Sequence, residues 1–253
     1  MNHNRPAHAQ ISIRPAKLAI LLAIASVLIA TVSSLAHIVR HHIIIDLDDP
    51  RADVLRRLDI VEEPSLTQWF SSSLHLSTAL LTVGIALSVG HRMFWRWIGL
   101  SVLFTYASID EAVMLHELMD RPVREYFGTS GFLAIAWIIP GSFIALIIGI
   151  SYMTFLRSLS LKIATLFVVG GEVFLSGAIL MEIPGGYLYE KYGFSSWHYI
   201  ASYAVEETLE MLGVVIFLYG LLCFIDEKTR DRENVSLGLN VHFHGRSEAS
   251  VEG

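Results

Sequence analysis

The sequence predicts an all-α fold, a polytopic membrane protein built as a bundle of about six transmembrane helices. Its composition, with 53% hydrophobic and 17% charged residues and a mean hydropathy of +0.54, is too apolar for an ordinary soluble domain. Windows of about twenty residues with little fixed charge are long enough to cross roughly 30 Å of hydrocarbon as helices. There are six such windows, at residues 17–39, 68–90, 94–118, 131–152, 161–183 and 198–225.

The first window has two interpretations. It follows a short basic tail, residues 1–16, and ends near the small residues Ser34-Leu35-Ala36, as a secretory signal peptide with a small-residue cleavage site would. We favour an uncleaved helix because the apolar run extends past about twenty residues, the length that spans a bilayer. Cleavage would leave five helices in place of six.

The distribution of basic residues predicts the orientation of the chain. With the N-terminus in the cytoplasm, eleven of the 18 Lys and Arg residues fall in cytoplasmic segments and seven in outer segments. Basic residues concentrate on the cytoplasmic side of membrane proteins. We therefore expect a multi-pass protein of the bacterial cytoplasmic (inner) membrane with both termini in the cytoplasm. The polar residues 226–253 would form a disordered cytoplasmic tail.

The connections between windows carry their own signals. Residues 40–67 form the longest outer connection, and within it residues 52–60 place apolar side chains at helical spacing with charges between them. This pattern predicts either an amphipathic helix on the membrane surface or a loop helix packed on the bundle. Pro122 is expected to end the third helix and Pro140-Gly141 to kink the fourth. Residues 184–197 are expected to form the last outer loop.

Charge and cysteine content exclude two classes of function. A net charge of −6, with no basic block beyond short pairs beside the membrane, argues against a nucleic-acid partner. The single cysteine, Cys223, excludes an intrachain disulfide and a CxxC redox motif. The partners expected instead are membrane lipid and an apolar small-molecule substrate.

The third window contains an unusual polar run, Ser-Ile-Asp-Glu-Ala-Val-Met-Leu-His-Glu at residues 108–117. An Asp at the centre of a membrane helix costs about 2.5–3.5 kcal/mol even on lenient insertion scales, so such a residue indicates a function. On one continuous helix, Asp110 and Glu117 differ by about 20° in direction and share a face, whereas Glu111 and His116 point elsewhere.

Other windows add polar residues at a similar depth. His75 lies in the second window, Glu182 at the outer end of the fifth, and Glu206, Glu207 and Glu210 in the outer part of the sixth. Glu206 and Glu210 form an i,i+4 pair on one helix face. We therefore expect these groups to meet Asp110 in the outer leaflet, with Glu172 nearer the middle of the membrane.

This cluster needs either bound cations or protonated carboxylates, because the windows carry no Lys or Arg at comparable depth. Carboxylates from facing helices, assisted by imidazole, are a usual way for a bundle to bind divalent iron, manganese or zinc. The predicted ligands are Asp110, Glu117, Glu182, Glu206, Glu210 and His75, with Asp110 and Glu210 also predicted to be catalytic. The Glu-x-x-His spacing of soluble di-iron proteins is absent, which argues against iron.

Each of these residues also has a structural interpretation. Glu117 and Glu182 could be solvated groups at helix ends, and Glu111 and Glu207 either ligands or hydrogen-bond partners between helices. His75, on a serine-rich face, fits a hydrogen-bonded packing role as well as a ligand role. His116 is expected to support a site or be structural, and the histidines at the outer boundary are expected to be interfacial: His37, His41, His42 and His198.

The motif Ser108-Ile109-Asp110-Glu111 followed by His116-Glu117, together with Glu206-Glu207 and Glu210-Met211 in the last window, resembles a group of uncharacterised bacterial polytopic membrane proteins. The resemblance covers two helices and implies no established activity.

Three functions remain open from the sequence. The first is a metal-dependent membrane enzyme acting on a lipid-like substrate that enters from the outer leaflet, with metal-bound water as the reactant. The second is a proton- or cation-coupled transporter in which Glu172 is the next step inward. The third is a structural subunit of a membrane complex. A transporter needs polar steps through the inner half of the membrane, and the sequence offers almost none there.

Overall fold

The computed structural model describes residues 14–43, 50–62 and 64–247, with side chains through Asp231, and every described element is a helix. The elements are α1 (Pro15–His42), α2 (Pro50–Leu58), α3 (Leu66–Ser88), α4 (His91–Val113), α5 (Glu117–Phe127), a 3₁₀ turn (Gly131–Leu133), α6 (Ile138–Leu156), α7 (Leu161–Leu175), a π-helical segment (Ser176–Met181), α8 (Glu182–Tyr192) and α9 (Trp197–Ser247). The all-α prediction is confirmed.

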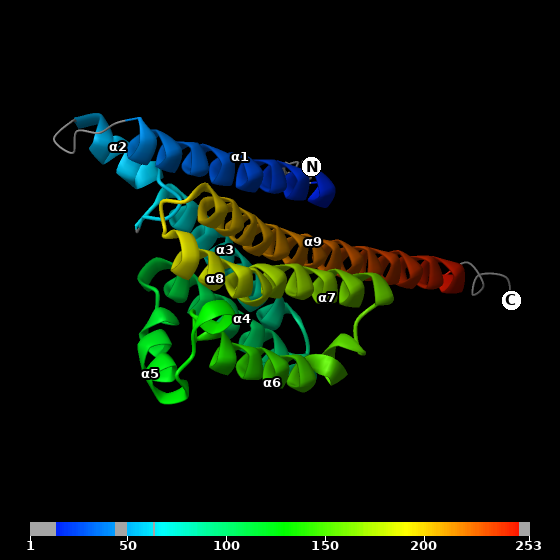
Figure 1. Cartoon of the computed structure of the whole chain (residues 1–253). Helices are drawn as coiled ribbons and strands as arrows, with labels where there is room; N and C mark the ends of the chain where they lie inside the picture. The colour runs from blue at the N-terminus through cyan, green and yellow to red at the C-terminus, as the bar shows by residue number, and fades with distance from the viewer. Residues whose placement is uncertain (1–13, 44–49, 63, 248–253) are drawn as a thin grey trace, which may run out of the picture.

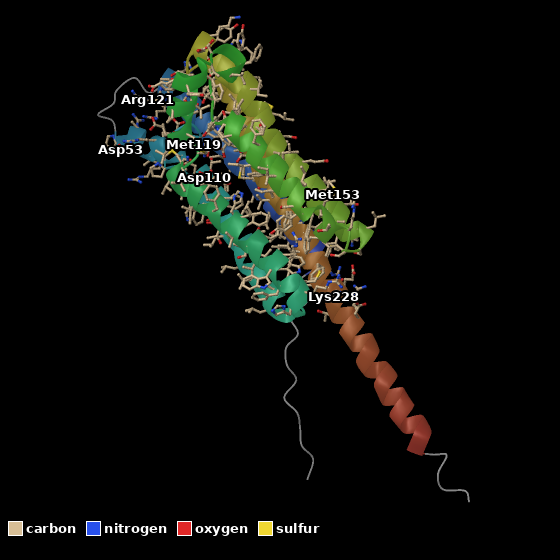
Figure 2. All side chains as sticks on the ribbon, turned by 90° about the horizontal axis from the view of Figure 1, so that it is seen from below. Asp53, Asp110, Met119, Arg121, Met153 and Lys228 are labelled. Carbon is tan, nitrogen blue, oxygen red and sulfur yellow. The ribbon has the colours of Figure 1, made fainter. Side chains whose placement is uncertain are left out.

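Five described helical stretches are long and apolar enough to cross a membrane, and α4 with α5 makes a sixth if this pair, bent by 83°, is one broken span. The long helices lie side by side, with α2 and α5 at one end of the bundle and the beginning of α1 toward the other (Figure 1). Figure 2 shows Asp110, Met119 and Arg121 at that first end and Lys228 toward the opposite one. We call the first end the α5 end.

The surface of the bundle is apolar along these helices. Leu21 on α1, Leu80 on α3 and Ile147 on α6 are 64%, 65% and 66% exposed. Contiguous apolar surface of this kind is unfavourable in water, whereas lipid tails solvate it well. The helices therefore present a lipid-compatible exterior, as the hydropathy predicts.

Packing away from the α5 end depends on aromatic side chains. Trp97 of α4 is fully buried and contacts Phe155 of α6 and Phe224 of α9, with ring centroids 5.1 and 4.9 Å apart. Phe167 of α7 stacks on Phe217 of α9 at 4.1 Å. Aromatic pairs in such geometries add about 0.5–1.5 kcal/mol each beyond the area that they bury, so this cluster joins four helices.

Glycines bring α7 and its π-helical extension close to α9. A Cβ atom added at Gly170 would lie 2.9 Å from the Gly213 carbonyl oxygen, and one added at Gly177 would lie 2.7 Å from the Glu206 carbonyl oxygen. Small residues at such crossings let two helix backbones approach each other in a membrane. This approach fixes the height of the glutamates on α9 against the end of α7.

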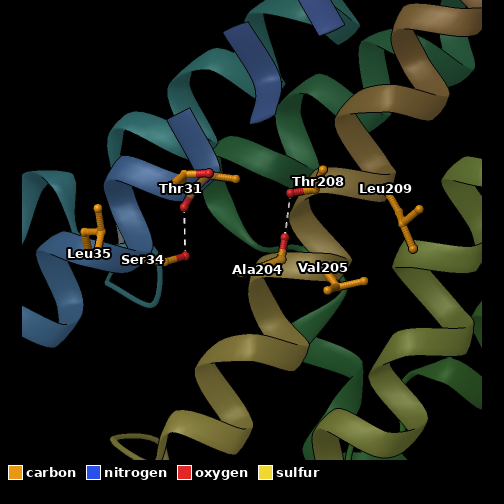
Figure 3. Close-up of a pocket in the computed structure, with 8 residues that line it drawn as sticks. Thr31, Ser34, Leu35, Ala204, Val205, Thr208 and Leu209 are labelled. Carbon is orange, nitrogen blue, oxygen red and sulfur yellow. Dashed lines mark hydrogen bonds between the residues drawn. The ribbon is translucent and has the colours of Figure 1, made fainter. Parts of the chain in front are cut away.

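The first and last long helices also pack together. Figure 3 shows a groove of about 380 Å³ between Thr31 and Ser34 of α1 and Ala204 and Thr208 of α9. Ser34 donates to the Ala30 carbonyl and Thr208 to the Ala204 carbonyl, each at 2.7 Å. These hydroxyls are satisfied within their own helices, so they leave little to recognise a polar ligand.

The structure corrects the predicted course of the third helix. The predicted single helix through residue 118 ends at Val113, because Met114 takes a left-handed conformation with φ 54°. Pro122 does not end this helix; it lies inside α5, a separate helix. The prediction that Asp110 and Glu117 share a face of one helix is therefore wrong.

Three further expectations differ from the structure. Pro140 lies in the first turn of α6, where its missing N–H is not needed, so it marks the start of that helix. Residues 184–192 belong to α8 and not to a loop. Pro184 is the third residue of α8, which follows the π-helical segment, where the hydrogen-bond register has shifted. The last helix continues to Ser247, beyond the predicted end at residue 225. The helix expected within residues 52–60 is α2.

Candidate functional site

A cavity of about 970 Å³ lies between α4, α6, α7 and α9. Its lining is acidic at the α5 end, and we call this part the acidic chamber: Asp110, Glu111, His116, Glu117, Glu182, Glu206, Glu207 and Glu210. The rest is lined mainly by apolar side chains, and we call it the apolar stem: Leu100, Leu103, Phe104, Ile148, Phe155, Phe167 and Phe217. The predicted meeting of acidic groups from three windows is therefore observed.

The break at Met114 creates a pair between Asp110 and His116. The chain turns back at this left-handed residue, so the backbone N–H of His116 donates to Asp110 Oδ1 at 2.8 Å. His116 Nδ1 lies 2.9 Å from Asp110 Oδ2. In the tautomer that carries its proton on Nδ1, this nitrogen donates to Asp110, and Nε2 is the nitrogen left for other chemistry. His116 was expected only to support a site, and the structure makes it a direct partner of Asp110.

The height of Asp110 is set by a serine contact between α3 and α4. Ser108 donates to the Ser72 carbonyl at 2.9 Å, and Ser72 donates to the Ser108 carbonyl at 2.8 Å. Each hydroxyl thus bonds the opposite backbone, which holds the two helices in register two residues before Asp110. The serine of the central motif is therefore a helix-contact residue.

Glu182 joins the chamber through Trp137. The indole Nε1 of Trp137, just before α6, donates to Glu182 Oε1 at 3.0 Å, and the ring lies 4.6 Å from the His116 ring between centroids. Glu182 is 9% exposed and directly follows the π-helical segment. Such segments shift the register of the residues that follow and often occur at functional sites. Asp110, His116, Trp137 and Glu182 thus form a continuous row.

The glutamates of α9 form the facing wall. Glu206 and Glu207 are 6% and 7% exposed, and Glu210 lies against the π-helical segment beside Gly177. Buried carboxyl groups need a cation, a proton or a donor to be stable. Because both residues line the cavity, Glu206 and Glu210 can present carboxyl oxygens to a ligand in the chamber.

The arginines that line the cavity have partners on their own helix. Arg124 pairs with Asp120 and Arg121 with Glu125, all within α5. Glu117 is exposed at the start of α5, where the helix dipole favours a negative charge. The acidic wall formed by α9 is therefore not neutralised by these arginines.

The predicted metal ligands do not form one close group. Within the described residues, three side chains place potential ligand atoms within 4.8 Å of one another, and these are His37, His41 and Asp59. His75 is 1% exposed, bonds the Ser71 carbonyl through Nδ1 at 3.0 Å, and meets Phe174 edge to face. These contacts fit its packing interpretation, and the role of the six predicted residues as metal ligands stays a prediction.

Comparison with known families identifies one family that matches most of the chain. Residues 17–224 match the family described as a domain of unknown function (DUF8692). The chain belongs to this family. No match is found among curated proteins or among solved structures. The DUF8692 region runs from the first turn of α1 into α9, so it contains the whole cavity. Any function must therefore be argued from the site itself.

Within the DUF8692 region, sequence reasoning missed the group formed by His37, His41 and Asp59. The two histidines are four residues apart on α1, a spacing that places them on one helix face, and this signal was visible in the sequence. Asp59 follows α2 and reaches the same point only because the connection between α2 and α3 folds back on α1. The spacing of residues predicts the helix α2 but does not predict where α2 and that connection lie against α1.

Proposed function

We propose that this DUF8692 protein is a membrane enzyme that binds a lipid-like amphiphile in its cavity and acts on the polar end of that molecule. One observation carries the proposal: a single cavity is acidic at the α5 end and apolar along the remainder. An amphiphile has the same two parts in the same order. A volume of about 970 Å³ is at the upper end of the range for small-molecule sites, which suits a chain with a head group.

Small residues on α6 make room for the apolar chain. Gly141, Ala145 and Gly149 all line the cavity at a spacing of four residues, so they form one stripe along the helix. A Cβ atom added at Gly149 would meet no atom within 4 Å. From Glu206 to Phe217 the lining of α9 extends about 16 Å at 1.5 Å per residue. That length accommodates a substantial part of an acyl or isoprenoid chain.

The chamber supplies acid–base chemistry. Asp110 holds His116 in the tautomer with Nδ1 protonated, and His116 Nε2 would take a proton from a hydroxyl or water and return it to a leaving group. The carboxylates of Glu206 and Glu210 would bind the cationic part of the substrate, either an ammonium group or a divalent ion carried with a phosphate. In the latter case the chamber would use the metal chemistry that the sequence predicts.

The orientation of the bundle is part of the proposal. The excess of basic residues in alternate segments would place the α5 end, and with it the chamber, at the outer leaflet of the bacterial cytoplasmic membrane. Substrate would then enter from that leaflet.

A transporter is the second candidate because Glu172 lines the cavity away from the chamber and is exposed. Phe155, Leu156 and Phe167 line the cavity beyond it, and such side chains provide no step for a proton or cation. The lining therefore favours an enzyme. Flux of protons into proteoliposomes that depends on Glu172, lost in Glu172→Gln, would reverse this preference.

The test is to fill the apolar stem with a larger side chain. We expect Gly149→Leu to keep the fold, because the new side chain enters open space, and to reduce the lipid that copurifies with the protein by about tenfold or more, equivalent to about 1.4 kcal/mol. Gly84→Leu is the matched control, since Gly84 also has open space around it and does not line the cavity. Lipid extraction and mass spectrometry would measure both. Equal lipid in the two variants would contradict the proposal.

A further inference from the structure

The end of α1 meets the connection between α2 and α3 in a polar contact outside the cavity. The backbone N–H of Ile60 donates to the Ser33 carbonyl at 3.3 Å, and the Thr67 hydroxyl donates to the Ser33 hydroxyl at 2.9 Å. These bonds hold the connection against α1. Asp59, directly before Ile60, is thereby placed beside the two histidines of the last turns of α1.

Asp59 is fully buried and accepts several hydrogen bonds. Its Oδ1 lies 2.7 Å from His37 Nδ1 and 3.0 Å from the Val61 N–H, and its Oδ2 accepts from Arg40 at 3.0 Å. The Arg40 guanidinium and the Val61 N–H hold this carboxyl group in one orientation beside both histidines.

Each histidine has a buried nitrogen that makes no hydrogen bond to a described residue, and the one of His41 lies 3.7 Å from Asp59 Oδ2. His37 Nδ1 lies within hydrogen-bond distance of Asp59 Oδ1, so Nε2 is the second ring nitrogen of His37. The Nε2 atoms of His37 and His41 are buried and have no hydrogen-bond partner among the described residues. The two rings lie 4.3 Å apart between centroids, and Phe194 covers His41 edge-on at 5.7 Å. Buried polar atoms of this kind call for an explanation.

We propose that His37, His41 and Asp59 form a binding site for a divalent transition-metal ion of the zinc class. Each residue offers one ligand atom, and the three atoms lie within 4.8 Å of one another. Zinc binds imidazole nitrogen at about 2.0–2.1 Å and commonly combines His with carboxylate ligands, so a small inward movement closes the group around an ion.

Arg40 is compatible with the ion because it has a second partner. Arg40 donates to Glu62 at 2.5 Å as well as to Asp59. It therefore keeps a contact with a carboxylate when Asp59 binds the ion. None of the three ligands lines the acidic chamber. The site is therefore separate from the proposed reaction, and a bound ion would tie α1 to the α2–α3 connection.

The experiment uses the full chain in detergent, dialysed against zinc alone and analysed for bound metal by plasma mass spectrometry. His41→Gln is expected to lose about one equivalent of zinc relative to the wild type. His42→Gln, the exposed neighbouring histidine, is the matched control and should lose none. A Glu206→Gln, Glu210→Gln double variant should keep this equivalent, which separates the site from the chamber. Zinc binding that is absent in the wild type, or equal in both histidine variants, would overturn the proposal.

A second measurement needs no variant and so does not depend on the fold of one. X-ray absorption at the zinc edge reports the ligands of an ion bound to the wild type. Imidazole nitrogen together with carboxylate oxygen is expected around the ion. A spectrum with no imidazole ligand would refute the site, whatever the variants show.

Discussion

At the scale of single residues, Met114 decides what the central motif becomes. A non-glycine residue at φ 54° costs of order 1 kcal/mol, and such a conformation persists only when its surroundings stabilise it. The two bonds from His116 to Asp110 supply that stabilisation. The motif therefore folds as a helix end followed by a turn, and the turn places an imidazole against a carboxylate in the lining of the cavity.

Removing Asp110 should therefore cost stability as well as function. Hydrogen bonds to a charged group contribute about 1.5–3 kcal/mol each, so we expect Asp110→Ala to lower the free energy of unfolding by about 2–4 kcal/mol in mixed micelles. Glu125→Ala removes a carboxylate from an exposed pair with Arg121. This variant should change the free energy of unfolding by less than about 1 kcal/mol. Similar losses in both variants would show that the Asp110–His116 pair does not hold the turn.

At the scale of elements, the contact of α7 and its π-helical extension with α9 sets the geometry of the chamber. Gly170 and Gly177 are seven residues apart and both face the α9 backbone. Residues seven apart lie on the same side of a helix, so the two helix backbones stay close to each other over about two turns. The extra residue per turn in the π-helical segment then directs Glu182 toward Trp137.

We expect Gly170→Ala to be destabilising although alanine favours helix. The new methyl group would lie 2.9 Å from the Gly213 carbonyl oxygen and from the Phe217 nitrogen, and such overpacking costs about 1–3 kcal/mol. Gly84→Ala, in open space on α3, should instead be neutral or stabilising by up to about 1 kcal/mol. Thermal unfolding of both proteins measures the difference. A Gly170→Ala protein as stable as Gly84→Ala would argue against close packing there.

The sequence predicts the helices well because membrane spans depend on the length of apolar runs, which is a local property. It also predicts that acidic groups of three windows meet, since their depth follows from counting residues. It does not predict the turn at Met114, whose backbone conformation depends on bonds formed by His116 two residues later. The position of Asp59 depends on tertiary contacts of the α2–α3 connection and is equally out of reach of a spacing argument.

At the scale of the whole molecule, the fold encloses an amphipathic space within a lipid-compatible exterior. Both α4 and α9 contribute acidic residues as well as apolar residues to the lining, so the two parts of the cavity are built together. The acidic part lies beside the break between α4 and α5, and the apolar part lies among the aromatic residues that hold the helices together. This arrangement suits a ligand that belongs to the membrane better than one dissolved in water.

The most direct measurement is photo-crosslinking of the reconstituted protein with a phosphatidylethanolamine that carries a diazirine at the end of one acyl chain. If the cavity holds the chain, peptides containing stem residues such as Ile148 and Phe155 should be labelled, and Gly149→Leu should abolish this labelling. Labelling confined to lipid-facing positions such as Leu80 and Leu21, and unchanged in Gly149→Leu, would contradict the proposal that the cavity binds an amphiphile.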